Sequence, residues 1–121
     1  MKGVLPECLL GSLFKKQQKI EIENNKFHKI LYKMKENPEY GELLGDIRFS
    51  GSPINPYSEM VEEALFNFQF SGALSRQNPD LILYSTTGNF DLSYQNLIKG
   101  LSPDVLSKLD KFSAELLRKL A

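Results

Sequence analysis

The stretch NPYSEMVEEALFNFQFSGALSRQNPDLILYS, residues 55–85, decides the fold of this chain. Its first half predicts an α-helix from about Ser58 to Ser71, because apolar residues recur every three or four positions: Val61, Ala64, Leu65 and Phe68. Either Asn55 or Ser58 can cap the start of this helix. Gly72 can end it, because glycine adopts the left-handed conformation that other residues resist.

Two more phenylalanines extend the apolar side of this helix. Phe66 and Phe70 lie beside the stripe, so we expect the helix to be buried on more than one side. Pro56 suits its first turn, where a missing backbone N–H costs little. The rest of the chain is expected to be organised around residues 55–85, of which this helix is the first part.

Two strand-like runs follow, at residues 73–76 and 81–85, and the turn-forming residues 77–80 (QNPD) join them. A helix, a glycine stop and a hairpin, with helices before them, form the skeleton of a winged helix. The predicted fold class is therefore α+β and mostly helical. We expect one domain over residues 1–121, with a winged-helix-like core at about 5–85 and two added C-terminal helices in 86–121.

The residues before this stretch predict two further helices, over 4–18 and 26–36, because both carry apolar residues at helical spacing. Between them, residues 19–23 (KIEIE) alternate in polarity and predict a short strand or an extended connector. Asn24 and Asn25 can cap the second helix.

The connection to the central helix is less regular. Residues 38–45 (PEYGELLG) predict one more short helix, which would bury Tyr40, Leu43 and Leu44. Residues 47–49 (IRF) are a candidate strand. Residues 50–56 (SGSPINP) predict a loop, because they contain two prolines and a glycine.

Two helices are predicted after the hairpin. Asp91 can cap the first, which continues to Lys99, and Ser102-Pro103-Asp104 is a strong start signal for the last. The last helix carries one apolar seam, the candidate for self-association: Val105, Leu109, Phe112 and Leu116. Packing within the chain explains this seam as well as dimerisation does, and we expect a homodimer.

Composition is that of a globular protein of one domain. The 121 residues are 41% hydrophobic and 25% charged, with a formal net charge of zero. The single cysteine, Cys8, excludes a disulfide within the chain and an all-cysteine zinc site, and its leucine neighbours predict burial. A cytoplasmic location is expected, because the N-terminus lacks the pattern of a signal peptide and is too short to span a bilayer.

The zero net charge conceals an asymmetry. Residues 1–35 hold eight lysines and three glutamates, a net of +5, and residues 36–121 have a net of −5. The split can mark a basic face for a polyanion, two halves that attract each other, or faces that pair between copies. Solvated lysines on helix faces are the favoured explanation.

The residues offer little to catalysis. His28 is the only histidine, which argues against a zinc site or a histidine-based triad, and it is expected on the surface. Phosphate-loop and dinucleotide motifs are absent from the sequence. No catalytic, cofactor-binding or metal-binding residue is therefore predicted. An enzyme would need an unrecognised pocket near Tyr84, Tyr94 and residues 86–90.

The central helix also argues against the usual mode of DNA binding. In a winged helix the helix before the wing enters the major groove, yet residues 58–71 carry three glutamates and no lysine or arginine. The candidate interaction face for a protein partner is accordingly on this helix: Glu59, Glu62, Glu63 and Asn67. Nucleic acid, if bound, would use other cations: Lys15, Lys16, Lys19, Lys26, Lys29, Lys33 and Arg76.

Three segments carry a resemblance to a known family: KFHKILY at residues 26–32, Pro56-Tyr57-Ser58, and ALFNFQFSGAL at 64–74. Over residues 5–85 the chain resembles small bacterial winged-helix proteins and Panacea (SocA-like) antitoxin domains. The resemblance implies a binding protein, either antitoxin-like or an adaptor.

Together these observations predict a non-enzymatic regulatory module that binds a protein partner, without a cofactor or a membrane. The alternative is a DNA-binding transcriptional regulator that dimerises through the last helix. A small enzyme with an unrecognised site is the second alternative.

Overall fold

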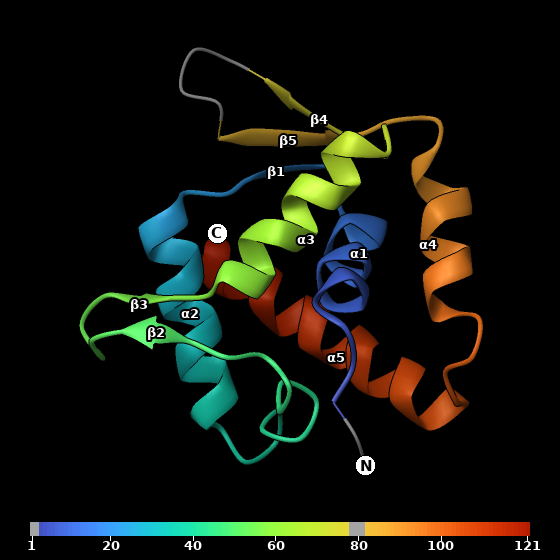
Figure 1. Cartoon of the computed structure of the whole chain (residues 1–121). Helices are drawn as coiled ribbons and strands as arrows, with labels where there is room; N and C mark the ends of the chain where they lie inside the picture. Colours follow the sequence, from blue (N-terminus) through green and yellow to red (C-terminus); the bar gives the residue numbers. More distant parts are fainter. Residues whose placement is uncertain (1–2, 78–81) are drawn as a thin grey trace.

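The computed structural model describes residues 3–77 and 82–121. The elements follow in this order: α1 (Pro6–Lys16), β1 (Lys19–Glu21), α2 (Asn24–Glu36), β2 (Ser50–Gly51), β3 (Pro56–Tyr57), α3 (Glu59–Phe70), β4 (Leu74–Gln77), β5 (Leu83–Thr86), α4 (Phe90–Ile98) and α5 (Pro103–Leu120). Most of the chain is helical and the strands form two small antiparallel sheets, so the predicted α+β, mostly helical class is confirmed (Figure 1).

The larger sheet lies across one end of the helices, with strand order β1-β5-β4 (Figure 1). Both pairings are antiparallel, and they place Ile20 and Arg76 on either side of Tyr84. Of the two possibilities predicted for residues 19–23, a strand is found at Lys19–Glu21, and the strands predicted on the two arms of the hairpin are confirmed in the described residues. Most of the predicted turn, at residues 78–80, lies outside the described residues. Outside the connection between α2 and α3, the order of helices and strands is the expected one, and the winged-helix assignment itself stays a prediction.

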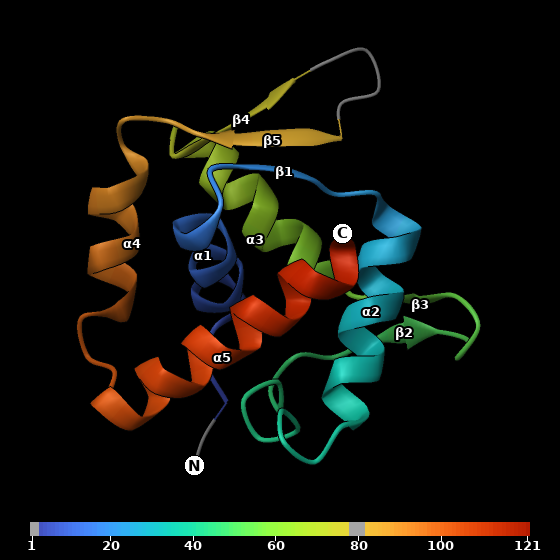
Figure 2. The same ribbon diagram turned by 180° about the vertical axis from the view of Figure 1, so that it is seen from behind.

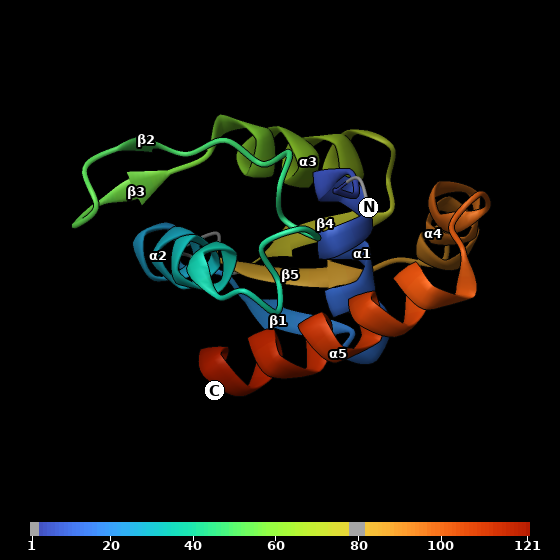
Figure 3. The same ribbon diagram turned by 90° about the horizontal axis from the view of Figure 1, so that it is seen from below.

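Helix α1 occupies the centre of the molecule. Helix α3 lies on one side of it and α5 on the opposite side, as Figure 3 shows from below, and α4 runs beside it. Every residue from Cys8 to Phe14 is buried. Gly11 lies within this buried run. A Cβ at this position would lie 2.5 Å from Cδ1 of Tyr94, so α4 approaches α1 too closely for a side chain there. The chain is thus organised around α1 rather than around residues 55–85.

Helix α5 begins as predicted. The Ser102 hydroxyl accepts a hydrogen bond from the Val105 N–H at 3.3 Å, and Pro103 occupies the first turn. Seen from behind, the helix crosses in front of α1 and ends near α2 (Figure 2).

The seam of α5 faces into the chain. Leu109, Phe112 and Leu116 are at most 1% exposed, and the partly buried Val105 packs against the same core. The prediction of a self-association surface at this seam was therefore wrong. The helix is a structural part of the core and not an addition to it.

The predicted boundaries of α2 and α4 need correction. Neither Asn24 nor Asn25 caps α2; the N-cap is Glu23, and the Asn24 amide donates to Glu62 Oε1 at 3.1 Å instead. Asp91 does not cap α4, which already begins at Phe90; its carboxylate pairs with Lys15. In both cases a contact with a distant element replaces the expected local cap.

The connection between α2 and α3 also differs from expectation. Residues 38–46 form successive turns instead of a helix, although they bury Tyr40, Leu43 and Leu44 as predicted. The predicted strand at 47–49 is wrong: the strand lies at Ser50–Gly51, inside the predicted loop, and pairs with Pro56–Tyr57. Pro56 therefore belongs to β3 and not to the first turn of α3.

Candidate interaction face

The ends of α3 follow its sequence. Ser58 and not Asn55 is the cap, because its hydroxyl accepts a hydrogen bond from the Val61 N–H at 3.4 Å. Gly72 ends the helix with a positive φ of 83°. The predicted core stripe is buried: Val61, Ala64, Leu65 and Phe68. These four residues turn one side of α3 toward α1.

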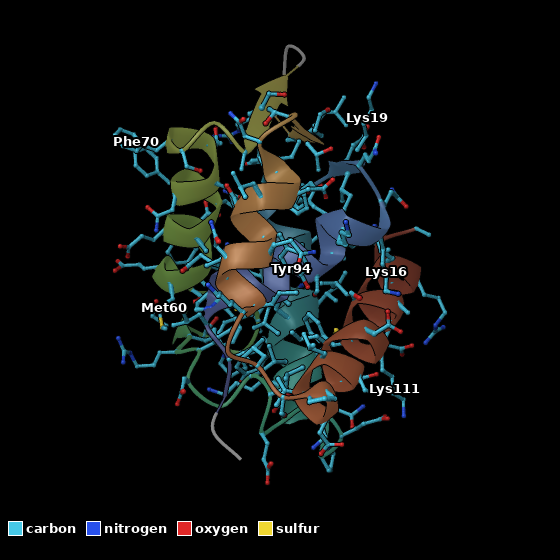
Figure 4. All side chains as sticks on the ribbon, turned by 90° about the vertical axis from the view of Figure 1, so that its right-hand side faces the viewer. Lys16, Lys19, Met60, Phe70, Tyr94 and Lys111 are labelled. Atoms are coloured by element: carbon cyan, nitrogen blue, oxygen red, sulfur yellow. The ribbon has the colours of Figure 1, made fainter. Side chains whose placement is uncertain are left out.

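The opposite side of α3 is uncovered. Phe66 is 60% exposed and Phe70 is 83% exposed, so the prediction that they bury a second side of the helix was wrong. Their rings stack on each other, with centroids 6.0 Å apart and planes 23° apart. Figure 3 shows α3 as the outermost layer on its side, and in Figure 4 Phe70 projects outward from its end.

Two glutamates continue this exposed line. Glu59, Glu63, Phe66 and Phe70 follow each other at intervals of four, three and four residues, so they form one stripe on the helix surface. We call these four residues the α3 stripe. The spacing was a usable signal, because it places both phenylalanines in line with the glutamates rather than with Val61. Of the other predicted interaction residues, Asn67 is exposed beside the stripe and Glu62 is partly buried.

Other large apolar side chains are exposed, but on separate elements. Leu5 precedes α1, Ile54 and Tyr57 belong to the β2–β3 hairpin, and Leu92 lies on α4. Within the described residues, the exposed large apolar side chains that stack on each other on one helix are therefore Phe66 and Phe70.

Glu62 points toward α2, where it meets His28. His28 is 1% exposed, so the prediction of a surface histidine was wrong. Its Nδ1 accepts a hydrogen bond from the Ser58 N–H at 3.1 Å, and its ring lies 4.8 Å from that of Tyr57. These contacts fix the start of α3 against α2.

The second ring nitrogen of His28 faces the carboxylate. Nε2 lies 3.5 Å from Glu62 Oε2, which is longer than a hydrogen bond of normal geometry, and it has no other hydrogen-bond partner within the described chain. The contact with His28 lowers the pKa of Glu62, against the opposing effect of partial burial. Glu62 is thus part of the α2–α3 contact rather than of the outer face.

Two grooves follow one flank of α3. The first, about 460 Å³, lies at its N-terminal half and is lined by Arg48, Phe49, Ser50, Glu59, Met60 and Glu63. The second, about 430 Å³, lies toward α4 and is lined by Glu7, Asn67, Phe68, Ser71, Ser93, Asn96 and Leu97. Burial raises the pKa of Glu7, and the negative charge of Glu63 adds to this effect. The flank beside the stripe is therefore hollowed and acidic.

The predicted nucleic-acid residues are exposed, but several make contacts within the chain. Lys15 pairs with Asp91 at 2.9 Å, and Lys16 pairs with Asp110 at 2.5 Å. The Lys26 ammonium donates to the Leu120 carbonyl at 3.4 Å. The basic N-terminal third is thus held to the acidic remainder, which was one of the predicted explanations of the charge asymmetry.

The remaining cations of that set lie on three different elements. Lys29 and Lys33 lie on α2, Lys19 lies on β1, and the Arg76 guanidinium lies 5.4 Å from the ring centre of Tyr84. Figure 4 shows Lys16 and Lys19 on the side of the molecule away from Phe70. The cations therefore lie apart from the α3 stripe.

The two tyrosines considered for catalysis are buried. Tyr84 is 3% exposed and Tyr94 is 6% exposed, and burial raises the pKa of Tyr94 to about 12. The pocket at the 86–90 loop, about 160 Å³, is lined by neither tyrosine. Cys8 is buried as predicted, and its thiol donates to the Leu97 carbonyl at 3.7 Å.

Residues 3–77 and 82–121 contain no group of three or more histidine, cysteine, aspartate or glutamate side chains placed to hold a metal ion. No helix in these ranges combines the length and the apolar character needed to cross a bilayer.

Comparison of the chain with protein-family models, curated proteins and solved structures finds no match. The resemblance to Panacea antitoxin domains stays a prediction.

Proposed function

We propose that this chain is a non-enzymatic regulatory module that binds a protein partner, antitoxin-like or adaptor-like, on a winged-helix scaffold. The α3 stripe is the observation that carries the proposal. Two stacked phenylalanines at 60% and 83% exposure are costly in water, and contiguous exposed apolar groups rimmed by polar ones mark interaction surfaces. Aromatic side chains are also enriched where proteins meet.

The same stripe argues against DNA as the partner of α3. Glu59 and Glu63 project from its outer face, where phosphates would repel them. The cations that DNA requires lie on other elements, and two of them are held in ion pairs with Asp91 and Asp110. These contacts support a protein partner over a nucleic acid.

The proposal is tested by affinity capture with three matched proteins. The wild type is compared with Phe66→Ser/Phe70→Ser, which removes the stacked pair, and with Leu92→Ser, which removes an apolar side chain that is 71% exposed on α4. The same protein is expected to be retained by the wild type and by Leu92→Ser, and to be lost from the double variant. Its direct binding to the purified chain is then measured.

Two results would contradict the proposal. One is capture that the double variant leaves unchanged. The other is tight binding of duplex DNA at physiological salt, with an affinity that falls steeply as salt rises, because that dependence reports phosphate contacts. In that case Lys29→Glu and Arg76→Glu should weaken the binding, and the DNA-binding regulator would replace the protein-binding module.

A further inference from the structure

We infer that the α3 stripe binds an amphipathic helix of the partner, aligned antiparallel to α3, with apolar residues in its N-terminal half and lysine or arginine in its C-terminal half. This inference rests on the proposed function and names the kind of partner.

The spacing of the stripe identifies a helix as the occupant. Its intervals of four, three and four residues are those of alternating d and a positions in a heptad, which form the seam between two packed helices. The opposite side of α3 packs against α1. The side that carries the stripe is not covered by the described chain and can pack against a second helix. An amphipathic helix in a groove is a common mode of recognition.

The length of α3 sets the length of the occupant. Its 12 residues rise by 1.5 Å each, so the helix is about 18 Å long. The two grooves follow the same flank: Met60 and Glu63 line the first, and Asn67 and Ser71 line the second. A partner helix of about three turns matches this length and has hollows beside it for its longer side chains.

The charges along the stripe set the chemistry of the occupant. Its N-terminal half is acidic, and neither Glu59 nor Glu63 forms an ion pair with any residue that the structure describes. Glu7, which lines the second groove, adds a third carboxylate close enough to Glu63 for their charges to interact, and Arg48 is the cation of the first groove. Lysine or arginine side chains of a partner would complement this excess of negative charge.

The order of charge and ring along the stripe sets the direction of the occupant. Its C-terminal half presents Phe66 and Phe70, which require apolar contacts. In an antiparallel partner, the residues opposite Glu59 and Glu63 come from the C-terminal half. Cations are favoured there by the partial negative charge at the C-terminus of a helix, and Glu59 is favoured in the first turn of α3 for the converse reason.

The test uses two synthetic helical peptides of about 14 residues, two heptads each. Both have the same composition: one has leucines at the seam positions of its N-terminal half and lysines at those of its C-terminal half, and the other has the reverse order. Fluorescence anisotropy measures their binding to the wild type across a salt series. The first peptide is expected to bind about tenfold more tightly than the second, with an affinity that falls as salt rises.

Variants locate the peptide on the stripe. Glu59→Gln/Glu63→Gln should weaken the first peptide roughly fivefold to tenfold and remove most of its salt dependence, because two charge pairs are lost. Phe66→Ser/Phe70→Ser should abolish binding. Glu36→Gln on α2 and Leu92→Ser on α4 are the matched controls, both at exposed positions, and should change nothing.

Equal affinity for the two peptides, or binding that Glu59→Gln/Glu63→Gln leaves unchanged, would overturn the inference. Dimerisation of the wild type that Phe66→Ser/Phe70→Ser abolishes would also overturn it, because a second copy would then occupy the stripe. If a captured partner needs Phe66 and Phe70 while neither peptide binds, the helical occupant is wrong and the proposed function stands. If capture and peptide binding are both independent of the stripe, both fail.

Discussion

Helices α1 and α3 lie side by side and are both rich in apolar residues, but they are buried in different ways. Between Cys8 and Phe14 α1 is buried all round, and it includes Gly11, whose lack of a side chain lets α4 come close. Helix α3 carries larger side chains than this part of α1, and its neighbours cover it on one side. The difference shows that apolar content does not set burial, because the neighbours of a helix decide which of its faces are covered.

The largest effect expected from this difference is on stability. Leu13 of α1 is completely buried, so Leu13→Ala should lower the free energy of unfolding by about 2–5 kcal/mol through lost contacts and a cavity. Phe66→Ala on α3 removes a larger side chain, yet it should change stability by no more than about 0.5 kcal/mol, because that ring is mostly in water. Chemical denaturation measures both. Equal losses from the two substitutions would contradict the comparison.

A second, smaller effect concerns the closeness of packing around α1. Gly11→Ala should destabilise the protein by about 1–3 kcal/mol, because the new Cβ overlaps the Tyr94 ring, although alanine favours helices. Gly88→Ala is the control, since a Cβ there meets no atom within 4 Å. Thermal denaturation compares the two variants. A stabilised Gly11→Ala protein would mean that α4 can move away from α1 at little cost.

The comparison also shows what the sequence could and could not predict. Helix α3 was found with its cap and its glycine end, and α5 with its start signal at Ser102, because such signals are local. The central place of α1 was not found, because it depends on α3, α4 and α5 arriving from distant parts of the chain. The burial of His28 was missed for the same reason: its partners, Ser58 and Glu62, are 30 and more residues away.

The two sides of α3 are also expected to differ in how their contribution to stability depends on pH. The pKa of Glu62 is lowered in the folded protein, so its carboxylate contributes stability that is fully present above the ordinary value of 4.5 and is lost as the pH falls through the folded value. At neutral pH, Glu62→Gln should cost about 1 kcal/mol, because the contacts with His28 and Asn24 weaken. The cost should shrink in acid.

Glu63→Gln is the matched control for this pH effect. Glu63 is the next residue of α3, but it is exposed and has no ion-pair partner among the described residues. Urea denaturation between neutral and acidic pH should therefore give nearly parallel curves for Glu63→Gln and the wild type, apart from the relief of the repulsion between Glu63 and Glu7. If Glu62→Gln lowers the free energy of unfolding by the same amount at every pH, the carboxylate charge is not the cause of the loss.

The smallest expected effect is at the exposed C-terminal end of α1. There Lys16 pairs with Asp110 of α5, and both side chains are partly in water. Lys16→Gln should therefore cost less than about 1 kcal/mol, and the cost should decrease with added salt, because the pair is accessible to screening. Lys29→Gln on α2 is the control, since this lysine is exposed and has no ion pair with a described residue. Denaturation at low and high salt distinguishes the two. If added salt does not reduce the loss of stability caused by Lys16→Gln, the loss comes from the packing of the Lys16 alkyl chain on α5. The charge of Lys16 would then contribute little to holding α1 against α5.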